Sequence, residues 1–379
     1  MIQPLISPDE FVGLGGVTHL CTGGEGPWFE QQERVYTEFA ELKGAGEGGR
    51  ERSFEIGEVC RSRVAGLWGV ARERVCFMSA GNDGLNAIAR GLAWEPGDNV
   101  VTTQLEFPSV AYAWRDLRQQ GVEVRMVAPR DWMVTEEDLL AAVDVRTRVL
   151  AVRQVSFYTG QCIDVRRLAA VRDDGVLLAV DATPASGVLN VPAHYADMCI
   201  SSSYKWRLAT HGVAPCYVGE ALETQLAPPG YGWRNLEVWP PQRALREPEV
   251  AVARMPYRME AGNPAMLLIL HLNESLRRIM EIGIEPVESH ARDLAGLLVD
   301  GLRDRGLPVL EPPSRAASSG NTCLIVEEAK QLQRALEERR VLTWGDYGRL
   351  RISTHLYNGE EDVDRLFAAL DQVEPELLE

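Results

Sequence analysis

Residues 176–181 read VLLAVD and residues 198–206 read MCISSSYKW, so two apolar segments each lead into polar side chains. Val176–Asp181 and Met198–Ser201 have the length and aliphatic composition of buried strands. Asp181 ends the first, and Lys205 follows the second after three serines. Ligands of open α/β sheets bind beyond the carboxyl ends of the strands. A single strand-to-strand passage separates Asp181 from Lys205, so both side chains can reach one crevice.

The neighbouring sequence alternates short apolar runs with helical periodicity, which is typical of a mostly parallel sheet covered by helices on both faces. The other expected strands are Val75–Met78, Asn99–Thr103, Glu123–Val127, Val149–Val155 and Val213–Val218. The expected helices are Gly84–Leu92, Val110–Gln120, Glu136–Ala142 and Val165–Asp173. The sequence thus predicts a large α/β domain with a mostly parallel seven-stranded sheet over residues 15–255.

A smaller α+β domain is expected from residues 1–14 and 256–379, where longer helices alternate with single strands. Its expected helices are Pro264–Ile282, Glu285–Arg305, Ala329–Arg340 and Glu360–Val373, and its expected strands are Asn321–Val326 and Arg349–Ser353. The segment before Trp28 is expected to return to this domain.

The overall composition points away from several classes of function. The 379 residues carry a net charge of −16, and such an acidic surface repels nucleic acid and anionic lipid. The chain has neither a signal-peptide pattern nor an apolar stretch long enough to span a membrane, so a cytoplasmic protein is expected. Its seven cysteines are scattered without CxxC or Cys/His spacing, which favours a reducing compartment and predicts no metal site.

Only three of the 39 basic residues are lysines, namely Lys43, Lys205 and Lys330. Lys43 lies in a Gly/Glu-rich segment that reads as a loop, and Lys330 lies on the polar face of an amphipathic helix. Lys205, just after a buried strand, would be partly desolvated, which lowers its pKa and favours the neutral amine that a Schiff base needs. The alternative for Lys205 is a surface lysine on a loop.

Two further segments fit the recognition of a phosphorylated aromatic cofactor. Residues 79–86 read SAGNDGLN where a strand turns into a helix, and backbone N–H groups at a helix N-terminus bind anions. Gly81 and Asn82 are the candidate residues there, although a plain capped turn has the same pattern. A carboxylate buried at Asp181 needs a cationic partner, which a protonated pyridine nitrogen supplies; the alternative is a helix cap.

An aromatic and a basic residue complete the set. Phe107 follows the expected strand Asn99–Thr103 and can stack on a planar ring, although an aromatic at this position also suits the core. Arg351 lies on an expected strand of the small domain and can bind a carboxylate with both arms of its guanidinium, or join an ordinary ion pair. Each feature has a structural alternative, but all of them occur at the strand ends that an α/β site requires.

With these residues in place, the chain resembles the class V aminotransferases. This group of fold-type I pyridoxal-phosphate (PLP) enzymes includes cysteine desulfurases, C–S lyases, isopenicillin N epimerase and kynureninase. The resemblance spans about residues 14–370 and is most specific at 77–92, 202–206 and 351–362.

The resemblance implies a role for each matching residue. Lys205 would carry the cofactor, Asp181 would pair with the pyridine nitrogen and Phe107 would cover the ring. The residues implied at the phosphate are Gly81, Asn82, Ser202 and Tyr204. Arg351 would bind the substrate carboxylate, and Asn263, in the segment 260–264, would reach the phosphate of a partner subunit. The last point implies a homodimer with shared active sites and a small amino-acid substrate.

The motifs of this chain resemble more than one branch of the family. Residues 157–161, FYTGQ, resemble kynureninase, which makes Phe157 and Tyr158 candidate substrate contacts. Pro184 stands where the family usually has a Gln or His that binds the cofactor's phenolic oxygen, and Ala209-Thr210 replaces the usual Gly-Pro. Cys323 lies in a strand-like apolar run and reads as core, which disfavours a desulfurase.

The sequence therefore predicts a PLP enzyme that forms a carbanion at Cα of an amino acid. The favoured reaction is cleavage of a Cβ substituent, either a C–S bond or a kynureninase-like C–C bond. The alternatives are an aminotransferase, an epimerase and a non-catalytic protein that retains the fold. A nicotinamide enzyme is disfavoured because no GxGxxG turn follows the first strand.

Overall fold

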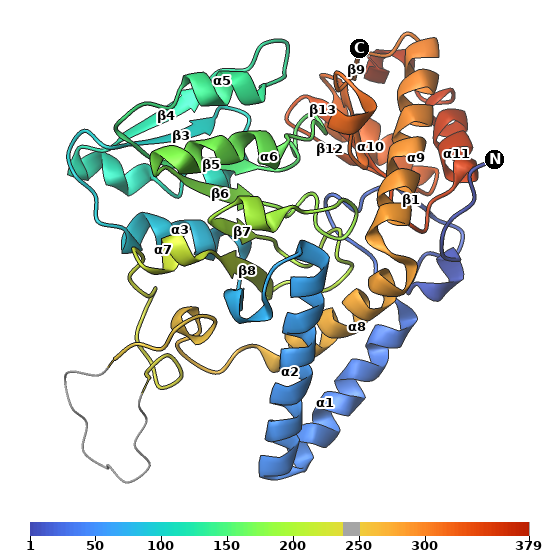
Figure 1. The fold of residues 1–379 in the computed structure, drawn as a ribbon. Coiled ribbons are helices and arrows are strands. Elements are labelled where there is room, and N and C mark those ends of the chain that lie inside the picture. Colours follow the sequence, from blue (N-terminus) through green and yellow to red (C-terminus); the bar gives the residue numbers. More distant parts are fainter. Residues whose placement is uncertain (238–250, 379) are drawn as a thin grey trace.

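Seven strands form the large sheet in the order β2-β8-β7-β6-β5-β3-β4 (Figure 1). The computed structural model describes residues 1–237 and 251–378. The strands are β2 (Val75–Met78), β3 (Asn99–Thr103), β4 (Glu123–Val127), β5 (Thr147–Arg153), β6 (Leu177–Asp181), β7 (Met198–Ile200) and β8 (Ala214–Val218). The five strands from β7 to β4 are parallel to their neighbours, whereas β8 runs antiparallel to both β2 and β7. This is the predicted mostly parallel sheet.

Helices cover both faces of this sheet, because successive side chains of each buried strand point to opposite sides. Val149 and Ala151 of β5 belong to a core cluster with Ile88 of α3 (Gly81–Gly91). Leu150 of β5 packs in a second cluster with Leu168 of α6 (Val165–Leu168). The helices α4 (Pro108–Ala111), α5 (Glu136–Ala141) and α7 (Glu220–Glu223) are short, like α6.

Three predicted helices of this domain differ in extent from the observed ones. The helix expected from Gly84 begins at Gly81, so residues 81–83 form its first turn. The helix expected over 110–120 is divided into α4 and a 3-10 helix at Arg115–Gln120, and these still bury Val110, Trp114 and Leu117 in one cluster. Similarly, the helix expected over 165–173 is α6 followed by a 3-10 helix at Ala169–Asp174.

Three long helices pack together below the large sheet in the view of Figure 1: α1 (Arg34–Gly44), α2 (Gly46–Trp68) and α8 (Met266–Ile282). The loop expected around Lys43 is wrong, because Lys43 lies in the last turn of α1. Of the glycines that follow Lys43, Gly49 is required by close packing, since a Cβ there would come within 1.8 Å of the Leu42 carbonyl oxygen. At this contact, glycine permits two helix backbones to approach each other.

The small domain contains a four-stranded antiparallel sheet in the order β12-β13-β10-β9. Its strands are β9 (Val309–Leu310), β10 (Asn321–Ile325), β12 (Trp344–Asp346) and β13 (Arg349–Ser353), and its helices are α9 (Ile284–Asp304), α10 (Ala329–Glu338) and α11 (Glu360–Leu370). Near the N-terminus, β1 (Thr18–His19) pairs in parallel with β11 (Val341–Leu342). Residues 18–19, expected within the large domain by the 15–255 boundary, thus pair with a strand of the 256–379 segment, the direction expected for the chain before Trp28.

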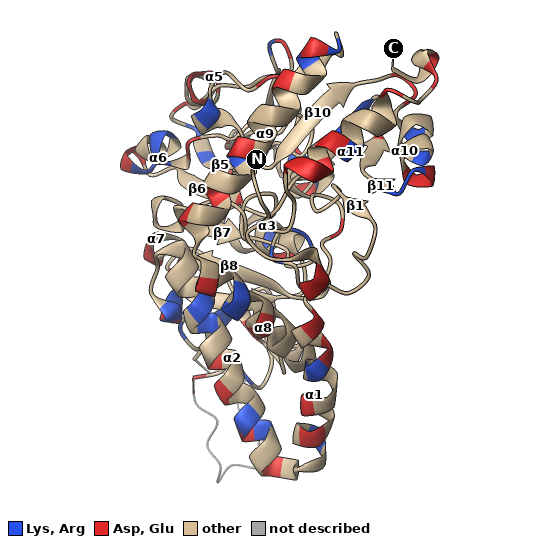
Figure 2. Ribbon diagram, turned by 90° about the vertical axis from the view of Figure 1, so that its right-hand side faces the viewer, with Lys and Arg blue, Asp and Glu red and all other residues tan. Residues whose placement is uncertain are grey.

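The outer helices carry charges of both signs. Figure 2 shows acidic and basic positions interspersed along α1 and α2, so neither sign forms a continuous stripe there. Within residues 1–237 and 251–378, no helix combines the length and the apolarity needed to cross a bilayer.

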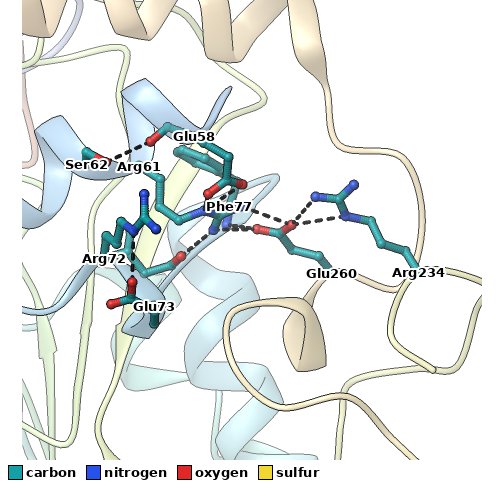
Figure 3. Close-up of polar contacts among 9 residues, drawn as sticks. Glu58, Arg61, Ser62, Arg72, Glu73, Phe77, Arg234 and Glu260 are labelled. Atoms are coloured by element: carbon teal, nitrogen blue, oxygen red, sulfur yellow. Dashed lines mark hydrogen bonds and ion pairs between the residues drawn. The ribbon is translucent and has the colours of Figure 1, made fainter. Parts of the chain in front are cut away.

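A buried ion cluster fixes the segment that follows residue 259 to the large domain (Figure 3). The Glu260 carboxylate lies 2.9 Å from Nη1 of Arg61 and 3.2 Å from Nη2 of Arg234, and it accepts a hydrogen bond from Phe77 N at 3.0 Å. The Glu260 side chain is only 2% exposed. It therefore links α2, β2 and the loop that contains Arg234.

Replacing Glu260 with alanine is expected to lower the free energy of unfolding by about 3 kcal/mol, because Arg234 would lose this carboxylate and the buried Arg61 would keep only the partly exposed Glu58. Denaturant unfolding of the cofactor-free protein measures this loss. The Arg72–Glu73 pair, also drawn in Figure 3, is exposed, so Glu73→Ala serves as the control and should leave the unfolding midpoint unchanged. If both substitutions lowered stability equally, burial would not be what makes the Glu260 ion pairs more stabilising than the exposed Arg72–Glu73 pair.

Candidate active site

The predicted site residues converge where β6 and β7 end and α3 begins. The two strands are parallel neighbours, and Asp181 lies beside Ile200 in register. Directly beyond these two residues, the backbone N–H of Ala182 donates a hydrogen bond to the Ile200 carbonyl at 2.8 Å. The segments after both strands therefore open at the same edge of the sheet, as the sequence predicted for Asp181 and Lys205.

The carboxylate of Asp181 is held at the end of β6. Asp181 is 7% exposed, and its Oδ1 accepts a hydrogen bond from Thr183 N at 2.8 Å. Burial raises the pKa of the Asp181 carboxyl, while the hydrogen bonding of Thr183 and the charges of Lys205 and Arg153 act in the opposite direction. A buried carboxylate of this kind gains stability from a cationic hydrogen-bond donor.

A cradle of backbone N–H groups and side-chain hydroxyls lies at the N-terminus of α3. Gly81 N donates to Ser202 Oγ at 3.1 Å, and Ser202 N donates to Thr183 Oγ1 at 3.0 Å. A Cβ at Gly81 would come within 3.0 Å of Ser202 Oγ, so a side chain there would fill the cradle. Asn82 is exposed at the next position, and its Nδ2 lies 3.5 Å from Asp83 Oδ1.

The amine of Lys205 lies between two aromatic rings. Its Nζ is 5.3 Å from the ring centroid of Phe107 and 5.3 Å from that of Tyr204. Burial lowers the pKa of Lys205 to about 8, and the charge of Arg351 acts in the same direction, against Asp181 and Glu25. At this pKa about one tenth of the amine is neutral and nucleophilic at pH 7, far more than for an ordinary lysine.

The N-terminal loop packs directly against the segment that carries Lys205. Gly26 N donates to the Tyr204 carbonyl at 3.0 Å. A Cβ at Gly26 would approach the Lys205 carbonyl oxygen to 2.2 Å, so only glycine permits this contact. Glu25 lies 3.5 Å from His211, whose ring stacks on Tyr204 with centroids 3.9 Å apart.

A buried ion pair that the sequence reading missed supports Phe107. Nη1 of Arg153 lies 2.7 Å from Oε1 of Glu106, and both side chains are at most 2% exposed. Arg153 ends β5 beside Asp181, and Glu106 immediately precedes Phe107. The pair thus ties the Phe107 loop to the sheet edge, and the only signal in the sequence is a charge at each of two strand ends.

The small domain contributes Arg351 to the opposite wall. Arg351 is 4% exposed, its Nη1 donates to the Phe157 carbonyl at 3.4 Å, and its guanidinium carbon lies 4.8 Å from the Trp344 ring centroid. The ring of Phe157 in turn meets that of Phe107 edge-on, with centroids 5.1 Å apart. Arg351 and Phe157 therefore lie near the lysine, as expected.

Two predicted residues, Tyr158 and Asn263, make their contacts with residues other than Lys205. Tyr158 stacks on Trp132 with centroids 5.1 Å apart, and its hydroxyl donates to the Tyr347 carbonyl at 2.8 Å. Asn263 accepts a hydrogen bond from Arg50 at 3.2 Å and lines a cavity of about 680 Å³ near the start of α3. Cys323 is fully buried in β10, which confirms that it belongs to the core.

The arrangement of these residues fits pyridoxal phosphate, the cofactor that the sequence resemblance implies. The cradle at Gly81 and Ser202 suits a phosphate, the buried carboxylate of Asp181 suits a protonated ring nitrogen, and the amine of Lys205 suits an aldehyde. Phe107 presents its ring beside the amine, where it can cover a planar group.

Comparisons with known proteins agree with this geometry. A sequence model described as "Aminotransferase class-V" matches residues 43–366. A probable cysteine desulfurase of Pseudomonas putida is 28% identical over 83% of this chain and 82% of its own length. An uncharacterised aminotransferase of Schizosaccharomyces pombe is 26% identical over 78% of this chain and 76% of its own length.

Solved structures share the fold across almost the whole chain. The cysteine desulfurase of Thermococcus onnurineus superposes with a TM-score of 0.86 at 20% identity, covering 98% of this chain and 99% of its own. The cystine C–S lyase C-DES, in complex with cysteine persulfide, gives a TM-score of 0.87 at 19% identity, covering 96% of this chain and all of its own. The fold expected from the sequence is confirmed. This chain belongs to the class-V aminotransferase family, whose enzymes act on amino acids with pyridoxal 5'-phosphate.

Proposed function

We propose that this chain is a PLP-dependent lyase that removes a substituent from Cβ of an amino acid. The observation that carries the proposal is the position of Lys205, an amine of lowered pKa next to Asp181 and Arg351. Lysine is the side chain that forms a Schiff base with the aldehyde of this cofactor. Within the family, the names of relatives and fold neighbours, which include cysteine desulfurases and a cystine C–S lyase, favour cleavage at Cβ.

Each residue of the site has a defined task in this proposal. When bound, the cofactor supplies an electron sink for charge that develops at the substrate's Cα. Lys205 holds the cofactor and then accepts the proton from Cα. Asp181 keeps a proton on the ring nitrogen, and Gly81 and Ser202 bind the phosphate. Arg351 holds the substrate carboxylate, so that the Cα–H bond points at the amine.

The products distinguish this reaction from its alternatives. For a substrate with a leaving group at Cβ, we expect one pyruvate and one ammonia for each substituent released, with one water consumed and no amino acceptor required. An aminotransferase, which the family name and the yeast relative favour, would instead stop after one turnover without a keto-acid acceptor. An epimerase would return solvent deuterium to Cα with inverted configuration. Either of these outcomes would refute the lyase.

We also propose that two copies of the chain share their active sites. The support is Asn263, which lines the cavity near α3 and belongs to the segment 260–264 that resembles the family's contact with a partner phosphate. The ion cluster around Glu260 holds that segment in place. Tyr231, 73% exposed, and Trp233, 44% exposed, offer apolar surface near this segment for a second copy.

A further inference from the structure

Strand β13 directs two arginines, Arg349 and Arg351, to the same side of the small sheet. Side chains two residues apart on a strand share a face and are separated by about 6.6 Å. The intervening Leu350 and the following Ile352 point the other way, into the apolar core of the small domain. Arg349 and Arg351 therefore face the large domain together.

Both guanidinium groups are buried without a carboxylate. Arg349 is 0% exposed and Arg351 is 4% exposed, and no ion pair joins either to an acidic residue in the described part of the chain. Across the sheet, Arg351 faces Cys323 and Trp344. Arg349 faces Asp346, which is exposed and accepts a hydrogen bond from Tyr347 N instead.

The contacts that Arg349 does make leave part of its guanidinium unsatisfied. Its Nη1 donates to the carbonyls of Phe157 at 2.9 Å and Tyr158 at 3.3 Å. Its Nε and Nη2, and Nε of Arg351, are buried and find no acceptor among residues 1–237 and 251–378. Burying a charged donor without an acceptor costs free energy, and repulsion between two adjacent cations increases this cost.

Arg349 lies two residues before Arg351 on β13 and contacts an aromatic ring that extends towards the reactive lysine. The charge of Arg351 acts directly on Lys205. Arg349 is 4.9 Å from the ring centroid of Phe157, which itself contacts the Phe107 ring beside Lys205. Because the two guanidinium groups share one face of β13, a molecule with two anionic groups about one two-residue spacing apart can contact both of them.

We propose that Arg349 binds a second anionic group of the substrate, carried by the Cβ substituent, while Arg351 binds the carboxylate on Cα. The assignment rests on the proposed lyase function and narrows its substrates to amino acids with an acidic side chain. A single dianionic ligand would then supply the acceptors that both arginines lack.

Binding of unreactive acids to the PLP-loaded protein tests the pair of arginines without any catalysis. Glutarate carries a carboxylate at each end, whereas valerate has the same number of carbons and one carboxylate. Calorimetric titration is expected to give glutarate at least about 10-fold tighter binding, because a second charge-assisted contact forms. Equal affinities for the two acids in the wild-type protein would overturn the proposal.

Substitution of Arg349 tests directly how much this residue contributes to the binding of glutarate. Arg349→Met is expected to abolish the preference for glutarate, and Arg349→Lys to keep part of it. The control is Arg334→Met, which removes an exposed positive charge from α10 and should leave the preference intact.

Kinetics then separate binding of the substrate from a merely structural role. We expect Arg349→Met to lower kcat/KM for an acidic amino acid about 50-fold, and that for β-chloroalanine less than about 3-fold. Equal losses for both substrates would mean that Arg349 only ties the loop of Phe157 and Tyr158 to β13, which would refute the assignment. If glutarate binds as expected but no substituent is released from any amino acid, the assignment of Arg349 stands and the lyase function fails.

Discussion

Replacing Lys205 with alanine is expected to lower turnover by at least about 10³-fold, because the same amine anchors the cofactor and moves the Cα proton. The visible absorption of the PLP-loaded protein should disappear as well. Borohydride reduction followed by mass spectrometry of peptides should place the adduct on Lys205 in the wild-type protein. The fold should persist, since the substitution removes a desolvated amine rather than an ion pair.

The chain offers its own controls for this experiment, because its only other lysines are Lys43 and Lys330. Both lie on outer helices, so Lys43→Ala and Lys330→Ala should retain colour, adduct and turnover. An adduct on either of them in the wild-type protein would remove the basis of the proposed function.

The same amine gives a pH dependence for cofactor capture by the cofactor-free protein. The pKa of Lys205 is lowered to about 8, so below this value the neutral fraction rises about tenfold for each pH unit. The second-order rate of PLP capture should therefore rise steeply up to about pH 8 and level off above it. A rate that continues to rise towards pH 10 would indicate an ordinary, solvated lysine.

The large sheet was predictable because its strands are short, apolar and bounded by turn residues. β2, β3 and β4 have the predicted ends, and the other strands of this sheet differ by at most two residues at either end. The Asp181 and Lys205 segments were recognisable because a charged residue after a buried strand needs a special environment. The strand pattern thus located the crevice before any side-chain contact was known.

What could not be predicted depends on contacts between distant segments. α1 and α2 were missed because their glycines read as loop signals, although Gly49 is required by the approach of the Leu42 carbonyl. Arg349 was missed because an arginine on a strand ordinarily faces solvent, and only the packed domains show that it is buried. Glu106 and Arg153 are 47 residues apart, so their pairing has no local signal.

Asp181→Asn is expected to reduce turnover about 10²–10³-fold while leaving the cofactor-free protein as stable as before. An amide is uncharged and cannot hold the proton on the ring nitrogen, so charge at Cα loses its stabilisation. Stability should not fall, because burial raises the pKa of this carboxyl, so that removing its charge removes a cost of folding. Steady-state kinetics and denaturant unfolding at pH 7 measure the two effects.

Asp197 provides the matched control, since it is a second buried aspartate that precedes β7 at the opposite edge of the sheet. Its carboxylate lies 3.1 Å from Arg172 and accepts a hydrogen bond from Leu178 N at 2.9 Å. Asp197→Asn should therefore destabilise the fold and spare turnover, the reverse of the pattern at Asp181. As the pH falls below about 4, the unfolded chain also protonates its aspartates, so any stability gained by Asp181→Asn should vanish there. If the two variants lost activity and stability in parallel, Asp181 would be a structural residue and not the partner of the ring nitrogen.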